Sequence, residues 1–223
     1  MIGKLSDFDA VIYDMDGVLT DSEPLWKIAM LEVFQGVGCS LTKEDFQKTV
    51  GLRIDEVIKY WYAVAPWKNS SPEEVEKAII DKMVELLKAQ ATPLPGVLAS
   101  LHYFAQQGKK IGLATSSYNI LIYTILDTLS VRSYFNAVHS AEDEAFGKPH
   151  PAVYLSAAAS LGCAPQRCLV IEDSLNGIIS GKAARMKVVC VPEKTHHPEP
   201  KLILADLILD NLNELIAYFE LHP

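Results

Sequence analysis

Two aspartates, Asp14 and Asp16, directly follow a short apolar run at residues 10–13 and precede Gly17. The run is rich in β-branched and aromatic residues and predicts a buried strand, and open α/β sheets hold their ligands at the ends of such strands. Two carboxylates at a strand end are costly unless a cation pairs with them. Gly17 lets the backbone turn sharply and approach an anion. This segment therefore predicts a site that binds a divalent metal and catalyses a reaction of a phosphate group.

Three further clusters of polar residues follow predicted strands. They are Thr115, Ser116 and Ser117 after residues 111–114, Lys148 in the loop after residues 137–139, and Glu172 and Asp173 after residues 168–171. Taken singly, each cluster has a simpler explanation as a helix cap or a solvated side chain. Hydroxyls and free amides that lead into a helix bind anions. Because parallel strands end at one edge of a sheet, we expect all three clusters to converge on Asp14 and Asp16.

The elements that position these clusters alternate in type from residue 97 onward. Helices of about ten residues separated by short apolar runs predict an α/β fold with a doubly wound, mostly parallel, Rossmann-like sheet. The expected strands span residues 10–13, 111–114, 137–139, 168–171, 188–191 and 206–209. The expected helices span residues 97–106, 120–129, 152–161, 177–185 and 212–219.

Residues 22 to about 92 break this alternation, because they carry helix signals and no convincing strand. Ser71, followed by a proline and by Glu74, has the pattern of a capped helix start. The expected apolar stripe of that helix comprises Val75, Ala78, Ile79, Met83, Leu86 and Leu87. We therefore expect a catalytic α/β core at residues 1–20 and 94–223, with an inserted helical cap domain at residues 21–93.

Composition limits the function classes. The chain has 223 residues, 49% of them hydrophobic, and a net charge of −8, so it has material for a core and is not expected to bind nucleic acid or anionic membranes. The N-terminus lacks a signal-peptide pattern, and no apolar run approaches the ~20 residues of a membrane span. The four cysteines form no Cys-x-x-Cys pair, so we expect buried reduced thiols in a cytoplasmic protein, as a monomer.

The four clusters, in this order, resemble the four motifs of the haloacid dehalogenase superfamily of phosphohydrolases. Residues 14–18 match the first motif, Thr115 the second, Lys148 the third, and the acid pair at residues 172–173 the fourth. The resemblance covers essentially the whole chain and includes a helical cap inserted after the first strand. It implies a phosphatase acting on a small-molecule phosphate ester.

The resemblance also implies a role for each acid. Asp14 is the expected nucleophile, which forms an aspartyl-phosphate, and Asp16 the expected general acid and then base. Mg²⁺ is the implied cofactor, held by Asp14, the backbone carbonyl of Asp16 and Asp173, with Glu172 as a direct ligand or one shell further out. The expected groups around the phosphate are Lys148, Thr115, Ser117 and the backbone amides of Met15, Asp16 and Ser116.

Within the superfamily the chain is most similar to sugar-phosphate phosphatases, of the hexitol phosphate and 2-deoxyglucose 6-phosphate type, and to β-phosphoglucomutases. The mutases carry a proton-relaying histidine where this chain has Trp26. Because indole is not a base, Trp26 favours a phosphatase. The alternatives are a phosphosugar mutase and a catalytically silent sugar-phosphate-binding protein.

Several cap and rim residues have two interpretations. Arg53 is expected to bind substrate, or else to pair with Glu56 or Glu23. Glu23 and Asn119 are further substrate-binding candidates. The aromatic residues Trp61, Tyr62 and Trp67 either stack on a sugar or, as the spacing favours, pack in the cap. His196 and His197 lie in a proline-containing loop far from the acids and are not expected to bind metal.

Overall fold

The computed structural model describes residues 2–42, 45–49, 52–192 and 200–222. Its centre is one sheet in which every neighbouring pair of strands is parallel, in the order β3-β2-β1-β4-β5-β6. The strands are β1 Ala10–Tyr13, β2 Lys110–Thr115, β3 Ala137–Ser140, β4 Cys168–Glu172, β5 Lys187–Cys190 and β6 Leu207–Ile208. All four residues of β1 are fully buried, as expected of a central strand covered on both faces.

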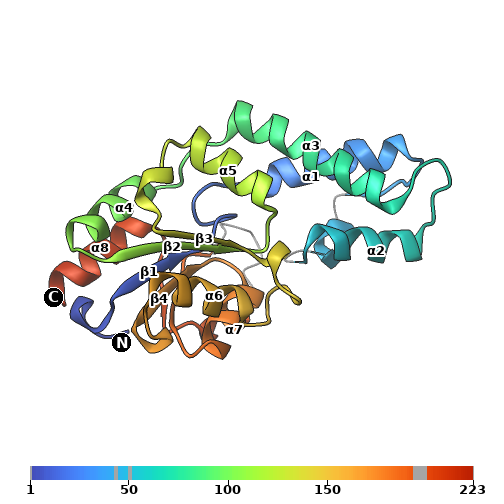
Figure 1. Cartoon of the computed structure of the whole chain (residues 1–223). Helices are drawn as coiled ribbons and strands as arrows, with labels where there is room; N and C mark the ends of the chain where they lie inside the picture. Colours follow the sequence, from blue (N-terminus) through green and yellow to red (C-terminus); the bar gives the residue numbers. More distant parts are fainter. Residues whose placement is uncertain (1, 43–44, 50–51, 193–199, 223) are drawn as a thin grey trace.

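Helices cover both faces of the sheet (Figure 1). One face carries α4 Val97–Gln106, α5 Asn119–Thr128 and α8 Leu212–Leu221, and the other carries α6 Ala152–Leu161 and α7 Leu175–Ala183. This arrangement confirms the predicted doubly wound α/β fold. Among the described residues, no helix is long and apolar enough to cross a membrane.

The predicted boundaries are close to the observed ones. Helices α4 and α6 begin and end at the predicted residues, whereas α7 begins two residues before the predicted start because Ser174 caps it by accepting a hydrogen bond from the Gly177 amide. Strand β6 has only two residues. The cysteines are free, as expected, but Cys163 is half-buried and not fully buried like the other three.

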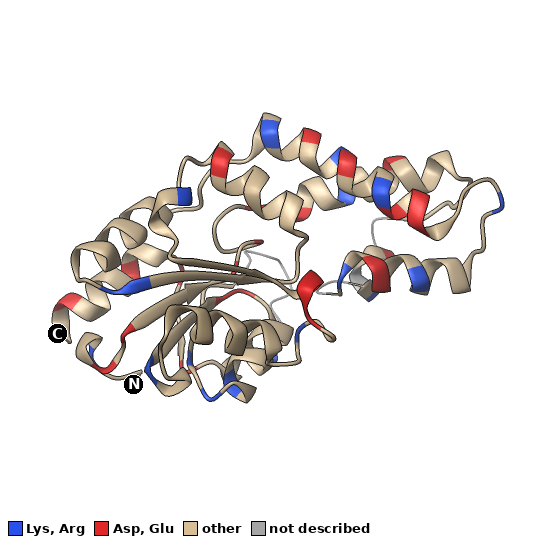
Figure 2. Ribbon diagram, in the orientation of Figure 1, with Lys and Arg blue, Asp and Glu red and all other residues tan. Residues whose placement is uncertain are grey.

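The inserted segment contains three α-helices in its described residues, α1 Glu23–Gly36, α2 Ile54–Val64 and α3 Pro72–Gln90. Ser71 and Glu74 form the predicted capping box at the start of α3. The expected stripe needs one correction: Ala78 is exposed, and Ile80 is buried in its place. Helix α3 packs against both α1 and α5, so its buried face is wider than a single stripe. Its remaining surface carries alternating acidic and basic residues (Figure 2).

Two linker segments join the inserted helices to the sheet, and they lie side by side. Thr20 and Pro93 form an isolated antiparallel bridge. The Thr20 hydroxyl donates to the Thr92 carbonyl at 2.8 Å, and the Leu94 amide donates to the Leu19 carbonyl at 3.0 Å. The polypeptide thus leaves and re-enters the α/β layer at one place, next to the end of β1.

Candidate active site

The end of β1 brings its two aspartates to the edge of the sheet. The Asp14 amide donates to the Ile171 carbonyl at 2.9 Å, which continues the ladder with β4 by one residue. Gly17 then adopts φ +71°, a conformation that other residues rarely adopt. A Cβ atom on Gly17 would lie only 2.0 Å from Asp173 Oδ2. Glycine at this turn therefore allows the fourth motif to approach the first.

Three carboxylates meet at this edge. One oxygen each from Asp14, Glu172 and Asp173 lies within 4.8 Å of the others. Burial, together with the charges of Glu172 and Asp16, raises the pKa of Asp14 to about 7 in spite of the nearby Lys148. Burial and the same kind of repulsion, from Glu172 and Asp14, raise the pKa of Asp173. Such repulsion between buried acids is relieved when a cation binds between them.

Lys148 is almost completely buried, with 6% of its surface exposed. Its Nζ lies 3.0 Å from Asp14 Oδ1 and 2.6 Å from Glu172 Oε1, and it donates to the Ala114 carbonyl at 3.1 Å. Burial alone would lower the pKa of Lys148, but the carboxylates of Asp14 and Glu172 outweigh it and raise the pKa. The ammonium group is therefore charged and held beside Asp14, the expected nucleophile.

Glu172 is fully occupied by hydrogen bonds within the protein. Its Oε1 accepts from Lys148 Nζ and from the Tyr154 hydroxyl at 2.7 Å, and its Oε2 accepts from the Asp173 amide and from the amide and hydroxyl of Ser174 at 3.0–3.1 Å. Burial would raise the pKa of Glu172, but the Lys148 charge and these hydrogen bonds lower it. In contrast, buried Asp14 Oδ1 accepts no hydrogen bond of good geometry from the described residues.

The Asp16 carboxylate accepts hydrogen bonds from the inserted segment and from the sheet layer. Ser22 Oγ and Trp26 Nε1 donate to its Oδ1, the indole at 3.4 Å, and Ser117 Oγ donates to its Oδ2 at 2.6 Å. Ser22 precedes α1 and Trp26 lies within it, whereas Ser117 follows β2. Trp26 therefore contacts the carboxylate of the expected acid–base residue directly.

The hydroxyl cluster after β2 lies where the sequence predicts. Thr115 Oγ1 accepts from the Ser117 amide at 3.2 Å, and Ser140 Oγ donates to the Ser117 carbonyl at 2.7 Å. The Thr115 hydroxyl keeps its own hydrogen for a ligand. Because Ser117 also donates to Asp16, this turn links β2 and β3 to the end of β1.

A cavity of about 170 Å³ joins these groups to the cap helices. Its sheet side contains Asp14, Asp16, Thr115, Ser116, Ser117, Lys148 and Asp173, and its cap side contains Trp26, Met30, Phe46, Leu52, Arg53, Ile54 and Val57. The predicted clusters thus converge on one space. An acid pair, a lysine and hydroxyl donors at one wall are the groups that phosphoryl transfer requires.

The substrate-binding candidates fall into two groups. Glu23 and Arg53 line the cavity, although Glu23 also pairs with Lys27 at 3.2 Å. Asn119 is not among the described residues that line it, and its side chain donates to Glu142 and Asp143 at 3.1 Å. Met15, a further candidate through its backbone amide, is fully buried and is not among the described residues that line the cavity.

The Arg53 guanidinium pairs with Asp55 and not with Glu56 or Glu23, the two acids that the sequence offered as its partners. Its Nε lies 3.2 Å from Asp55 Oδ1, and its Nη1 donates to the Ala141 carbonyl at 3.0 Å. Glu56 accepts only from the Arg53 amide, as the N3 residue at the start of α2. This pairing was missed because i, i+2 side chains are not neighbours within a helix, and Arg53 lies just before the helix.

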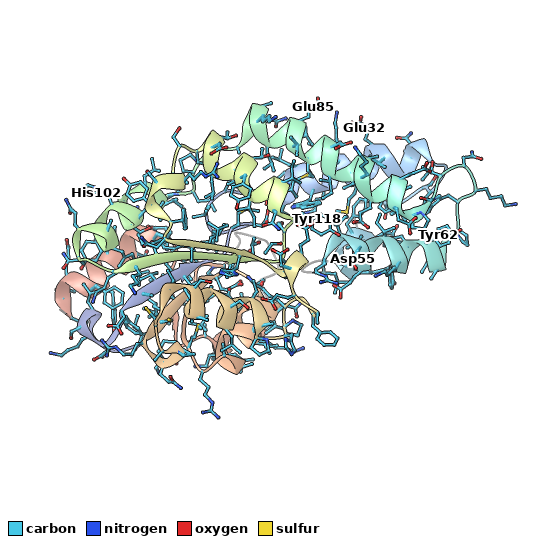
Figure 3. All side chains as sticks on the ribbon, viewed as in Figure 1. Glu32, Asp55, Tyr62, Glu85, His102 and Tyr118 are labelled. Carbon is cyan, nitrogen blue, oxygen red and sulfur yellow. The ribbon has the colours of Figure 1, made fainter. Side chains whose placement is uncertain are left out.

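The cap aromatic residues make ring contacts with other aromatic residues of the cap, Trp61 with Tyr60 at 4.9 Å. Trp61 and Trp67 are buried, and Tyr62 makes an edge-to-face contact with Trp67 at 4.8 Å. None of Trp61, Tyr62 and Trp67 is among the described residues that line the cavity, and Tyr62 lies on α2 in Figure 3. This placement agrees with the packing interpretation. His196 and His197 fall outside the described residues.

Sequence reasoning missed the Ser22 donor to Asp16 and three further residues at the site. Asn176 and Tyr118 line the cavity, and Tyr154 holds Lys148 and Glu172 from beneath. Asn176 lies one residue before the helix predicted at residues 177–185 and three residues after the acid pair, which was a usable signal. The position of Tyr154, six residues after Lys148, gave none, because an aromatic residue on an apolar helix normally indicates core.

Comparisons with known proteins identify the family and agree with the fold. The haloacid dehalogenase-like hydrolase family matches residues 11–191. The chain is 41% identical over 209 residues, 93% of this chain and 94% of the other, to hexitol phosphatase B of Escherichia coli strain K12. It superimposes with a TM-score of 0.86 on CbbY from Rhodobacter sphaeroides in complex with phosphate, at 23% identity, covering 93% of this chain and 96% of that one.

A β-phosphoglucomutase from Clostridium difficile gives a TM-score of 0.82 at 25% identity, over 96% of both chains. The chain belongs to the haloacid dehalogenase-like hydrolases. It is an enzyme of the phosphatase type within that family.

Proposed function

We propose that this enzyme is a magnesium-dependent phosphatase that hydrolyses small sugar or polyol phosphates, of the hexitol phosphate or 2-deoxyglucose 6-phosphate type. The observation that carries the proposal is the shared cavity, which places Asp14, Asp16 and Lys148 at one wall and the cap residues opposite. The 41% identity to a protein named hexitol phosphatase B supports the substrate class.

In the proposed mechanism, Asp14 attacks phosphorus and forms an oxygen–phosphorus bond as the ester oxygen leaves. Asp16 donates its proton to that oxygen and then accepts a proton from the water that hydrolyses the aspartyl-phosphate. Each donor that holds Asp16 orients its carboxylate for both transfers. Dividing the reaction in this way returns Asp14 and Asp16 to their starting protonation states.

Charge on the transferring phosphoryl group is stabilised by groups already in place. Lys148 supplies a buried positive charge, and the Thr115 hydroxyl and the amides of Met15, Asp16 and Ser116 supply hydrogen bonds. Buried donors of this kind do not need to reorganise during the reaction. A typical contribution is about 10²–10³ in rate for one such donor.

The donor set fits Mg²⁺. Asp14 and Asp173 present carboxylate oxygens, of which Asp14 Oδ1 is buried and, besides its ion pair with Lys148, accepts no hydrogen bond of good geometry from the described residues, and all-oxygen ligation suits this hard cation. We propose that these two side chains and the backbone carbonyl of Asp16 hold it. Glu172 lies close enough to bind the metal directly, but because its oxygens already accept five hydrogen bonds, we expect it to interact with the groups around the metal instead. When bound, the metal supplies positive charge against the phosphoryl oxygens.

The proposed cap domain, residues 21–93, covers the cavity and sets selectivity. Its contribution to the lining is mainly apolar, with Glu23, Thr49 and Arg53 as polar groups for hydroxyls. This enclosed space favours a small organic phosphate over a protein substrate. The unpaired cysteines accord with the proposed cytoplasmic location.

Trp26 supports hydrolysis over phosphoryl return to the sugar. Its indole donates to Asp16 and cannot relay a proton from a sugar hydroxyl. To test the mutase alternative, β-glucose 1-phosphate is incubated with a trace of the bisphosphate. We expect release of inorganic phosphate and no glucose 6-phosphate; accumulation of glucose 6-phosphate would replace this proposal with a mutase.

The main test assays p-nitrophenyl phosphate and a panel of hexose and hexitol phosphates with Mg²⁺, with EDTA, and with Asp14→Asn. The matched control is Asp9→Asn, which alters an exposed acid at the other end of β1. We expect hydrolysis to disappear with EDTA and in Asp14→Asn and to persist in Asp9→Asn. Activity that persists both in EDTA and in Asp14→Asn would contradict the proposal.

A further inference from the structure

Tyr154 lies beneath the catalytic wall and does not reach the cavity. It is on α6, its side chain is fully buried, and its hydroxyl lies 3.0 Å from Lys148 Nζ and 2.7 Å from Glu172 Oε1. The Lys148 ammonium also stands 4.7 Å from the centroid of the Tyr154 ring. Tyr154 therefore contacts both partners of the buried ion pair at once.

Counting hydrogens shows what the hydroxyl does. An ammonium group has three hydrogens, and Lys148 Nζ has four oxygens within 3.1 Å: those of Asp14, Ala114, Tyr154 and Glu172. The tyrosine hydroxyl has one hydrogen, which it donates to Glu172 Oε1. The Glu172 oxygen that faces Lys148 thus shares its hydrogen-bonding capacity between two donors.

We propose that Tyr154 is a positioning residue for Lys148. The Tyr154 hydroxyl donates to the Glu172 oxygen that competes for the ammonium group, and so keeps the ammonium group directed toward Asp14. Without this hydroxyl, Lys148 has three oxygens for its three hydrogens, but Glu172 Oε1 has Lys148 as its single donor, attracts the ammonium more strongly and draws it away from Asp14. The inference rests on the proposed phosphatase function, because it is the phosphoryl group on Asp14 that Lys148 must reach.

The hydroxyl, and not the ring, carries this role. The ring packs in the apolar cluster beneath the sheet, where phenylalanine would fill nearly the same volume. Tyr154→Phe therefore removes two polar contacts from the network and leaves the packing. Networks of this kind are best apportioned by double-mutant cycles.

The chain offers a matched control. Tyr13 is also fully buried, and its hydroxyl makes one buried hydrogen bond, to Ser100 at 3.0 Å, outside the catalytic groups. We expect both Tyr→Phe variants to fold in urea denaturation experiments, with a larger loss of stability in Tyr154→Phe because its two contacts are to charged groups. Only Tyr154→Phe should lose catalysis: we expect kcat on p-nitrophenyl phosphate to fall about tenfold, with KM changed less than about twofold.

A second measurement does not depend on turnover. Orthovanadate mimics the five-coordinate geometry of phosphoryl transfer, so its binding to the Mg²⁺-loaded protein should weaken about tenfold in Tyr154→Phe and not in Tyr13→Phe. The cost of Tyr154→Phe should also shrink strongly in a Glu172→Gln background, where the competing charge is gone.

Equal kcat and equal vanadate binding in the two Tyr→Phe variants would overturn the proposal. So would a Tyr154→Phe protein that does not fold while Tyr13→Phe does, because the hydroxyl would then serve stability. An unchanged cost in the Glu172→Gln background contradicts the route through Glu172. Wild-type protein that hydrolyses no phosphate ester would instead remove the proposed function, and this inference with it.

Discussion

Gly17→Ala tests whether the turn after β1 is what allows Asp173 to approach the first motif. The new methyl group carries two costs. Alanine at φ +71° is strained by about 1 kcal/mol. The methyl carbon would also lie 2.0 Å from Asp173 Oδ2, whereas ordinary contacts begin at 3.4 Å, so the carboxylate must move by about 1.4 Å (3.4 − 2.0).

These two costs are separated by Gly108→Ala. Gly108 has φ +67°, and a Cβ atom there meets nothing within 4 Å. In urea denaturation without Mg²⁺ we expect Gly108→Ala to lose about 1 kcal/mol from strain alone, and Gly17→Ala to lose more because it must also displace a carboxylate. Only Gly17→Ala should need more Mg²⁺ for half-maximal activity, and its kcat should fall about 10²-fold, as expected for a displacement of about 1 Å.

Magnesium titrations of p-nitrophenyl phosphate hydrolysis give both quantities for the two variants. If Gly17→Ala keeps the wild-type kcat and Mg²⁺ requirement while it loses the same stability as Gly108→Ala, Asp173 does not contribute to the metal site as argued above. If both variants lose activity equally, the effect comes from backbone strain and not from displacement of a carboxylate.

Three further outcomes follow from individual contacts. Ser22→Ala should lower kcat more than Trp26→Phe, because the Ser22 hydroxyl is closer to Asp16 than the indole at 3.4 Å; steady-state kinetics with the reverse order would contradict this. Asn176→Ala should raise KM for hexitol phosphates about tenfold and leave KM for p-nitrophenyl phosphate unchanged, since Asn176 lines the cavity. Burial would raise the pKa of Asp206, but hydrogen bonds from Lys182, the Val188 amide and Lys187 lower it. Its stabilisation is therefore complete above about pH 4 and is lost as pH falls through its folded pKa, so the stability difference between wild type and Asp206→Asn should shrink between pH 7 and pH 3.5 in urea denaturation.

The core of the site was predictable from the sequence because of one topological rule. Asp14, Thr115 and Asp173 each follow an apolar run, and parallel strands end at a common edge, so their convergence needed no knowledge of side-chain packing. Lys148 lies eight residues after the end of β3, so the rule does not fix its position. Its long side chain nevertheless brings Nζ to 3.0 Å from Asp14 Oδ1.

The residues that could not be predicted depend on contacts between elements distant in sequence. Asn119 starts α5, but the loop after β3 supplies Glu142 to its amide and side chain, and this draws the side chain into that contact. Tyr118 donates to Glu76 of α3 at 2.6 Å, which joins the core to the cap (Figure 3). Local patterns record the face of a helix but not its partner, and for this reason Ala78 was also assigned to the wrong face of α3.

The cap and the catalytic core meet at Asp16. Its Oδ1 accepts hydrogen bonds from Ser22 and Trp26, which belong to the cap segment, and its Oδ2 accepts one from Ser117 of the core. A core that lacked the cap would leave Asp16 with one of these three donors. In the proposed enzyme the cap therefore does more than enclose the substrate, because the orientation of Asp16, the proposed acid–base residue, depends on side chains that the inserted segment brings. Insertion directly after β1 places those donors six and ten residues from Asp16, close enough to reach it.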